Sequence, residues 1–245
     1  MIPLTIALLL AVVTRASAVN LPEYIHVCKR RDPNVENCIS QSVEHLRPYL
    51  VKGVPERNIP SLEPLLLKEL VAAEGTGIRI SARNVHAYGA SDFTVKRLKI
   101  DLDKLRFEVD INLPHLYIDG MYEIAGRVLL LPISGTGPMQ GNFTQCTGAV
   151  RMQGALRKDK AGEDHLYYSD FRMKISIGKG NLRLENLFGG ERTLGDVVNA
   201  AINNNFDAFI RELKPLIEKA LSESFLEISN RIVEPFTYKQ LFPDN

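Results

Sequence analysis

The sequence predicts an α+β domain in which a strongly curved antiparallel β-sheet wraps around a long C-terminal α-helix. Two observations carry this prediction. A period-two alternation of apolar and polar residues runs from Ile78 to about Leu184, and an apolar stripe at helical spacing continues from Leu194 to Ile232. That stripe spans about 40 residues, or about 60 Å of helix. The apolar face of the strands and the apolar stripe of the helix must both be buried. We therefore expect the sheet to wrap the helix and to leave an apolar hollow between them.

The first residues have the character of an export signal. The apolar run from Ile2 to Val13 is too short to span a bilayer, and Ala16-Ser17-Ala18 has the small-x-small pattern of a cleavage site. A buried N-terminal helix is the alternative. We therefore predict a signal peptide at residues 1–18, a secreted extracellular protein, and one lipid-binding domain at residues 19–245.

Composition excludes some partners. Lys and Arg number 30 against 29 Asp and Glu, and removal of residues 1–18 takes away Arg15 and makes the charge zero. A neutral chain with scattered basic residues argues against nucleic acid as a partner. No later run is apolar enough to cross a bilayer, so we expect no stable membrane insertion. We expect a monomer, and the sequence implies no cofactor.

Three cysteines and one glycosylation sequon remain to be placed. In an oxidising compartment we expect Cys28 and Cys38 to pair, since a zinc site would need further ligands close by. Cys146 alternates in phase with apolar neighbours and is interpreted as a core thiol. Asn142-Phe143-Thr144 is the single sequon, and it follows a turn-rich segment that we expect at the surface.

The N-terminal part predicts a short helix. Asp32 can cap it, Pro33 suits its first turn, and Gly53 ends it. Its apolar face consists of Val35, Ile39, Val43, Leu46 and Leu50. The proline-bounded patch from Ile59 to Leu65 follows, and we expect either a short helix or turn that packs on the core or a guard at its mouth.

The middle of the chain predicts long antiparallel strands with one solvated face. The alternation is strongest at 98–102, 105–113, 122–130 and 171–177. Glycine-containing segments at 119–120, 135–141, 160–162 and 178–180 are predicted as the turns between strands. We expect the apolar faces to pack on the C-terminal helix, the only large partner available.

Thr193 is the expected N-cap of the C-terminal helix. Pro215 lies within it and should bend it, or else divide it into two shorter helices. The tail from Leu241 to Asp244 is apolar enough to fold back onto the domain.

We find no catalytic or metal-binding constellation. Gly89-Ala90-Ser91-Asp92-Phe93 lacks the last glycine of a hydrolase nucleophile elbow, so Ser91 is interpreted as a turn residue. The five histidines form no close pair and no His-Glu-x-x-His helix. His45 lies off the apolar face of its helix and is expected at the surface. We therefore expect a binding protein and not an enzyme, with a lipid esterase acting through Ser91 as the rival.

Several motifs in order resemble the takeout/juvenile-hormone-binding protein family of insects. They include Gly53-Val54-Pro55, Gly120-Met121-Tyr122-Glu123-Ile124, Leu187-Phe188-Gly189-Gly190, Asn203-Asn204-Asn205 and Leu241-Phe242-Pro243-Asp244. The resemblance implies a TULIP-like super-roll with a tubular apolar cavity that holds small lipophilic molecules outside cells. Hormone carriers of this family have a second disulfide, and this chain has no fourth cysteine. It is therefore closer to the takeout-like branch.

The predicted function is carriage of a lipophilic ligand in an internal apolar tunnel. The ligand could be a terpenoid like juvenile hormone, a fatty acid or another long-chain lipid, and a receptor is a further possible partner. The alternative is a module of the same fold that interacts with membranes or bacterial lipids. Candidate ligand-binding residues, each of which could instead be plain core, are Tyr122, Tyr117, Ile124, Val128, Leu130, Phe188, Phe206 and Phe209. Tyr122 is the first candidate for a polar group that faces the ligand.

Overall fold

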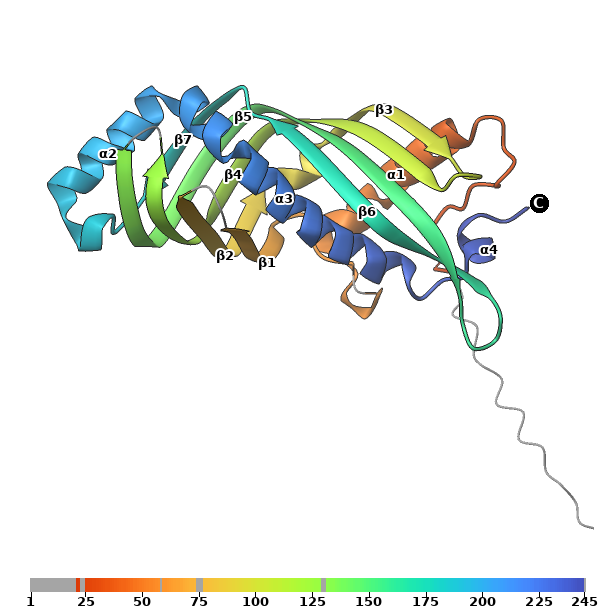
Figure 1. Cartoon of the computed structure of the whole chain (residues 1–245). Helices are drawn as coiled ribbons and strands as arrows, with labels where there is room; N and C mark the ends of the chain where they lie inside the picture. Colours follow the sequence, from red (N-terminus) through yellow and green to blue (C-terminus); the bar gives the residue numbers. More distant parts are fainter. Residues whose placement is uncertain (1–20, 23–24, 58, 74–76, 129–130, 245) are drawn as a thin grey trace, which may run out of the picture.

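The computed structural model describes residues 21–244 apart from 23–24, 58, 74–76 and 129–130. The predicted signal peptide at 1–18 and Leu130 lie outside these residues. A long, strongly curved antiparallel sheet wraps around the C-terminal helix, and a shorter helix covers one end, as predicted (Figure 1). The strands are β1 Leu65–Ala73, β2 Ile78–Tyr88, β3 Thr94–Asp101, β4 Arg106–Val128, β5 Leu131–Lys158, β6 Asp164–Ser176 and β7 Lys179–Leu184.

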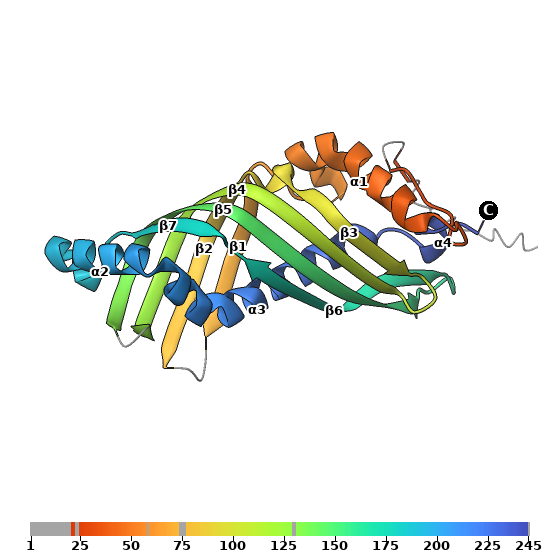
Figure 2. The same ribbon diagram turned by 90° about the horizontal axis from the view of Figure 1, so that it is seen from above.

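Strands β4 and β5 form a continuous ribbon that runs the length of the molecule. It pairs from Arg106 opposite Gln153 to Val128 opposite Leu131. Along one half the ribbon is flanked by β2, with β1 beyond it, and by β7; along the other half it is flanked by β3 and β6. The two halves curve around different partners, which is visible from above in Figure 2.

Two predicted turns were wrong. The segments 119–120 and 135–141 lie inside β4 and β5, while 160–162 and 178–180 do connect strands. Gly120 and Gly137 lie where another segment of the backbone comes very close to the strand. A Cβ on Gly120 would lie 3.1 Å from the Cα of Val85, and one on Gly137 would lie 2.5 Å from the carbonyl oxygen of Glu185. Glycine therefore allows the backbones to crowd in this tightly curved part of the sheet.

The helices are α1 Val35–Lys52, α2 Arg192–Asn204, α3 Phe206–Val233 and α4 Tyr238–Leu241, with short 3₁₀ turns at Pro55–Arg57, Ala90–Asp92 and Phe188–Gly190. Gly53 ends α1 as predicted, and its N–H donates to the carbonyl of Leu50. The cap expected at Asp32 is displaced, because α1 begins after Asn34; the Asp32 carboxylate accepts the Asn34 N–H instead, at 2.8 Å.

The C-terminal helical region is divided at Asn205, and Pro215 lies inside the continuous α3. The long C-terminal helix is confirmed as α3, but the apolar stripe that begins at Leu194 forms two helices and not one, and the break between them is not near Pro215. The N-cap is Glu191 and not Thr193: its carboxylate accepts the N–H of Thr193 at 3.2 Å and that of Leu194 at 2.5 Å. A charged carboxylate is a stronger acceptor for the first-turn N–H groups than a hydroxyl.

Polar side chains of α2 and α3 hydrogen-bond to the backbone of β6 and β7. The bonded pairs are Asn199 with Leu184, Asn203 with Leu182, Glu218 with Ile175, Ser222 with Met173 and Asn230 with Tyr168. Four helical residues rise about 6 Å and two strand residues about 6.6 Å, so side chains spaced by four meet alternate strand residues. The helices thus satisfy exposed edge groups that another strand would otherwise pair.

The C-terminal helices do not cover the whole sheet. The cluster at the far end joins Leu102, Phe107 and Leu166 to Tyr238 of α4, with Val35 of α1 packed against it. The tail folds back as predicted: the Arg30 N–H donates to the Pro243 carbonyl at 2.9 Å. The expectation that the C-terminal helix is the only large partner was therefore wrong, because α1 and the tail cover this half.

Candidate ligand-binding site

Among the cavities in the described part of the domain, two share no lining residue. One, the α1 cavity, has a volume of about 330 Å³ and lies between α1, the sheet and the C-terminal tail. The other, the α2 cavity, has a volume of about 300 Å³ and lies where α2 meets α3. Both are at the lower end of the range for ligand pockets. The continuous tunnel that the sequence predicted stays a prediction, and these two cavities have separate linings.

The α1 cavity draws its walls from segments far apart in the sequence. Its apolar lining comes from the segment before α1, from α1, from β3 to β6, from the end of α3 and from the tail: Ile25, Val27, Ile39, Val43, Leu46, Val95, Leu98, Ile100, Phe107, Val109, Met152, Leu166, Val233, Leu241 and Phe242. No Lys, Arg, Asp or Glu is among its lining residues. An apolar molecule can leave water here without bringing a charge out of solvent.

Few polar groups face the α1 cavity, and one of them already has its partners. The Ser42 hydroxyl donates to the carbonyl of His26 or Cys38, at 2.9 and 3.0 Å, and lies 3.0 Å from Nδ1 of His26. It therefore fixes the segment around Cys28 to α1. His26 and Ser40 also contribute to the lining.

Tyr168 is a polar residue of this cavity whose hydroxyl forms no hydrogen bond among the described residues. Its backbone N–H and carbonyl are bonded to Asn230 at 2.7 and 3.0 Å, and its ring packs edge-on against Phe107. Among the described residues, none forms a hydrogen bond with its hydroxyl. Burial raises the pKa of Tyr168 to about 12. Tyr168 as a whole is partly exposed, so its hydroxyl is free to donate to a ligand, and the apolar lining would strengthen that hydrogen bond.

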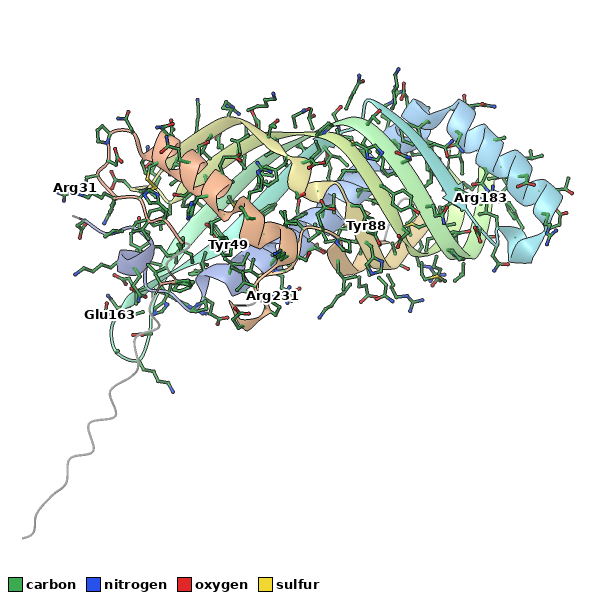
Figure 3. All side chains as sticks on the ribbon, turned by 180° about the vertical axis from the view of Figure 1, so that it is seen from behind. Arg31, Tyr49, Tyr88, Glu163, Arg183 and Arg231 are labelled. Atoms are coloured by element: carbon green, nitrogen blue, oxygen red, sulfur yellow. A yellow bond between two sulfur atoms is a disulfide. The ribbon has the colours of Figure 1, made fainter. Side chains whose placement is uncertain are left out.

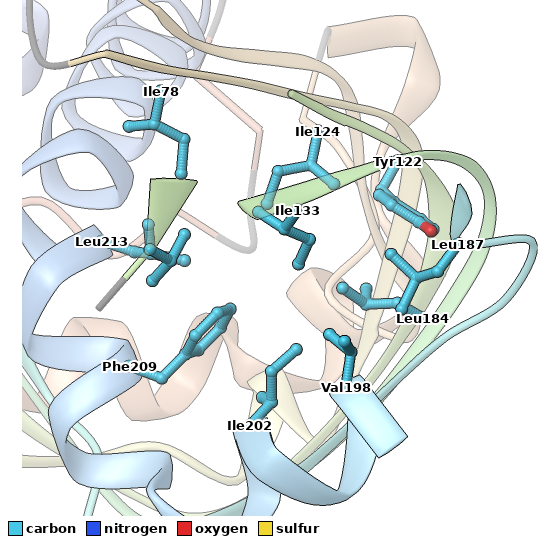
Figure 4. Packing of buried hydrophobic residues seen from close by; sticks show 11 residues of the cluster. Ile78, Tyr122, Ile124, Ile133, Leu184, Leu187, Val198, Ile202, Phe209 and Leu213 are labelled. Atoms are coloured by element: carbon cyan, nitrogen blue, oxygen red, sulfur yellow. The ribbon is translucent and has the colours of Figure 1, made fainter. Parts of the chain in front are cut away.

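The α2 cavity contains two residues that the sequence predicted, Val128 and Phe209. The rest of its lining is Ile133, Val198, Ala201, Ile202 and Asn205. Ile124 and Tyr122 belong to the buried cluster beside it (Figure 4). Phe188 is partly buried and packs against that cluster. The predicted residues thus gather at this end, and most of them form its core.

Tyr122 does not offer its hydroxyl to a ligand in this structure. The side chain is 4% exposed, and the hydroxyl donates to the carbonyl of Glu185 at 2.7 Å. Burial raises the pKa of Tyr122 to about 12. The bond joins β4 to the loop before α2, which is a structural role.

Two further candidates lie apart from both cavities. Tyr117 pairs with Tyr88 and Asn142 on the outer face of the sheet, and its ring centroid is 5.7 Å from that of Tyr88. Its placement in the ligand site was wrong, because the alternation of β4 turns Leu116 and Ile118 inward instead. Phe206 packs on Phe143 and Cys146 in a separate buried cluster.

The cysteines follow the sequence prediction. Cys28 and Cys38 form a disulfide, and Cys146 is free and buried, with its thiol pKa raised by that burial. His26 lies close to both disulfide sulfurs, but these are bonded to each other and are not available as metal ligands. His45 is exposed as predicted.

Ser91 has the turn position that the sequence predicted. It lies in the 3₁₀ turn Ala90–Asp92, is buried, and donates its backbone N–H to the Glu63 carboxylate at 2.9 Å. Burial tends to raise the pKa of Glu63, but the bonds from Ser91 and Gly89 lower it overall. This arrangement anchors the turn and provides no histidine base for the serine.

The site that sequence reasoning missed is the α1 cavity. Its signals were present as separate patterns, namely the apolar face of the first helix and the alternation at 98–102 and 105–113. Nothing local in either pattern shows that they face each other. Across the described residues, no helix combines the length and apolar character needed to cross a membrane.

Comparisons with known proteins agree with this architecture. The circadian clock-controlled protein daywake of Drosophila melanogaster is 24% identical over 231 residues, which cover 90% of this chain and 88% of the relative. A putative beta-carotene-binding protein of Schistocerca gregaria is 20% identical over 212 residues, covering 86% and 85%. The crystal structure of Epiphyas postvittana Takeout 1 superposes with a TM-score of 0.73 at 22% identity, over 89% of this chain and all of that one. The model of the haemolymph juvenile hormone binding protein (JHBP) family matches residues 6–243, and the chain belongs to this family.

Proposed function

We propose that this protein is a secreted carrier that binds one neutral lipophilic molecule in the α1 cavity, with the Tyr168 hydroxyl as hydrogen-bond donor to it. One observation carries the proposal: an uncharged apolar lining includes Tyr168, whose hydroxyl has no hydrogen-bond partner among the described residues. Membership of the juvenile hormone binding protein family supports a lipophilic ligand. The name of the Schistocerca relative points to the same class.

Burial of the hydrocarbon part provides the affinity. Each methylene removed from water contributes about 0.8 kcal/mol, so a body of ten carbons gives about 8 kcal/mol. Ordering and association cost at least about 4 kcal/mol of this. The remainder corresponds to a weak complex, and a good hydrogen bond to Tyr168 adds about 1 kcal/mol or more. A larger ligand would gain more but would need space from the interior between the two cavities.

The lining also selects among lipid classes. A carboxylate in this cavity would lose its hydration without meeting a cation from the lining. An ester, ketone, epoxide or alcohol can accept the Tyr168 hydrogen bond without that penalty. We therefore expect neutral oxygen-bearing terpenoids or lipids to bind more tightly than fatty-acid anions of the same length.

Secretion is the second part of the proposal. The Cys28–Cys38 disulfide fits an oxidising compartment, and the family description refers to haemolymph. Expression of the whole chain in insect cells tests this part. We expect the protein in the medium, with Val19 as its first residue.

Displacement of a solvent-sensitive fluorescent lipid probe tests the ligand class. The competitors are an alcohol, a methyl ester and a carboxylate of one chain length, measured at pH 8. We expect the ester and alcohol to displace the probe at concentrations at least tenfold below the carboxylate. Equal potency for all three would contradict the role of the uncharged lining.

Two matched variants test the role of Tyr168. Tyr168→Phe should weaken ester and alcohol binding by about fivefold to tenfold and leave the affinity for the plain hydrocarbon unchanged. Tyr167→Phe, one residue along β6 and absent from the cavity lining, is the control and should change neither. An equal loss of affinity for the hydrocarbon would show that Tyr168 only shapes the cavity.

A further inference from the structure

The outer face of the sheet contains the one sequon of the chain at the centre of its longest ribbon. Asn142 of β5 pairs with Tyr117 of β4 and with Asn181 of β7, and Tyr88 of β2 continues the row. Figure 3 shows this side of the molecule, opposite α3, with Tyr88 near its middle. The sequence predicted a sequon that follows a turn-rich surface segment. The sequon instead lies within a strand that is paired on both sides.

Strand alternation fixes the direction of the sequon side chains. Phe143, its middle residue, is buried and packs on Phe206 of α3 with ring centroids 6.0 Å apart. Because neighbours in a strand point to opposite faces, Asn142 and Thr144 point outward. Asn142 is exposed, and Thr144 is partly exposed. The buried Phe143 side chain thus holds the Asn142 amide on the outer face of the sheet.

A histidine orients the amide. Nε2 of His115, which lies two residues before Tyr117 in β4 and pairs with Thr144, is 2.5 Å from Oδ1 of Asn142. A ring N–H donates to this oxygen, which leaves the amide nitrogen Nδ2 facing solvent. Among the described residues, no hydrogen bond to Nδ2 is found. The nitrogen that would be modified is therefore the free end of the amide.

We propose that Asn142 carries an N-linked oligosaccharide, an inference that rests on the proposed secretion. In the transfer, Nδ2 of Asn142 forms a bond to the anomeric carbon of the first sugar of a lipid-pyrophosphate-linked oligosaccharide. The bond from that carbon to the pyrophosphate breaks, the lipid pyrophosphate leaves, and the amide loses one proton. Oδ1 is not consumed, so the bond from His115 persists in the glycoprotein.

The surroundings suit a first sugar on this face. Tyr117 is the direct cross-strand neighbour of Asn142, with their Cβ atoms about 5 Å apart. Its ring, beside that of Tyr88, offers an apolar surface to one face of the sugar. Tyr88 is 38% exposed, so the glycan would cover an exposed aromatic pair. Asn142, His115 and Tyr117 line neither cavity, so the glycan leaves ligand binding free.

The test begins with the whole chain expressed in insect cells and collected from the medium. We expect an intact mass above that of the polypeptide by one oligosaccharide, and digestion with a peptide-N-glycosidase should remove the excess. The enzyme leaves an aspartate in place of Asn142, which peptide mass spectrometry localises. Secreted protein of unmodified mass would overturn the proposal.

Three variants separate the sequon from the fold. Asn142→Gln and Thr144→Ala should lose the oligosaccharide completely, while Thr144→Ser keeps the sequon and should retain it. If the first two variants are not secreted, the peptide map of the wild-type protein still shows whether Asn142 carries the oligosaccharide. Retention of the oligosaccharide in Asn142→Gln would contradict the assignment.

A second version, led by a proven signal peptide in place of residues 1–18, separates this proposal from the proposed function. Glycosylation of this version without export of the native one would refute the native signal and leave the site standing. Probe binding before and after deglycosylation completes the test, and the two affinities should agree within twofold. A loss of binding on deglycosylation would contradict the independence of the outer face from the cavities.

Discussion

Asn199→Ala is the sharpest test of how the C-terminal helices are held to the sheet. Oδ1 of Asn199 accepts the Leu184 N–H at 2.9 Å, and its Nδ2 donates to the carbonyls of Leu184 at 2.9 Å and Gly195 at 3.0 Å. Asn199 and Leu184 are both buried. The alanine would therefore remove the partners of two backbone groups at a covered sheet edge.

The size of the effect follows from these groups. Each buried donor or acceptor left unsatisfied costs about 1–3 kcal/mol, so the N–H and carbonyl of Leu184 together lose about 2–6 kcal/mol. Alanine is the better helix former, which returns about 0.6 kcal/mol. We expect a net loss of about 3 kcal/mol in the free energy of unfolding. For a domain of this size, that corresponds to a melting temperature lower by about 6–12 °C.

Urea and thermal unfolding followed by circular dichroism measure this loss. Asn181→Ala is the matched control, because Asn181 lies in the same strand, is exposed, and forms no side-chain hydrogen bond among the described residues. It should change the free energy by less than about 0.5 kcal/mol. If both variants lost equally little free energy of unfolding, water would be satisfying the Leu184 backbone groups. The hydrogen bonds of Asn199 would then not hold α2 to β7 as we infer.

Three further predictions concern buried polar groups. Tyr122→Phe should lower the free energy of unfolding by about 1 kcal/mol, measured in urea, and leave probe displacement by each lipid unchanged, because its hydroxyl bonds to the Glu185 carbonyl. Glu218→Ala should cost about 2 kcal/mol or more in the same assay, and Glu218→Gln clearly less, because glutamine can still accept the Ile175 N–H. Stability should fall as pH rises from about 10 to 12: the native pKa values of Tyr122 and Tyr168 are about 12 against about 10 unfolded, so the unfolded chain loses these protons first. Melting temperatures across this range test it, and Tyr168→Phe should flatten the fall; an unchanged slope would contradict the assignment.

The fold class was predictable because it depends on periodicity. The alternation at 105–113 lies in β4, and the helical stripe from Leu194 onward lies in α2 and α3. The predicted turns were wrong where the structure of a residue depends on a contact with a residue distant in the sequence. Gly120 and Gly137 were interpreted as turns because local sequence does not show that Val85 and Glu185 approach them. The break between α2 and α3 at Asn205 likewise could not be predicted, because no proline or glycine lies at this position.

The candidate site was predictable in part, for the same reason. Val128 and Phe209 were found because each belongs to a long apolar stripe, and both line the α2 cavity. Tyr168 was missed because its importance depends on its place in a cavity made by segments far apart in the chain, where its hydroxyl has no partner among the described residues. Apolar alternation indicates which face is inside. It does not indicate where the inside is incompletely filled.

The side-chain hydrogen bonds from α2 and α3 to the edges of β7 and β6 explain how an incompletely filled interior can coexist with a stable fold. A helix held only by its apolar stripe must pack closely against the sheet, because dispersion contacts are lost across any gap. Here Glu218, Ser222 and Asn230 attach α3 to the edge of β6 through directional bonds, and Asn199 and Asn203 attach α2 to β7. The helices are thereby fixed at the edges of the sheet. Their position does not depend on close packing at either end of the interior, where the two cavities lie, so space for a ligand can be kept without loosening the helices.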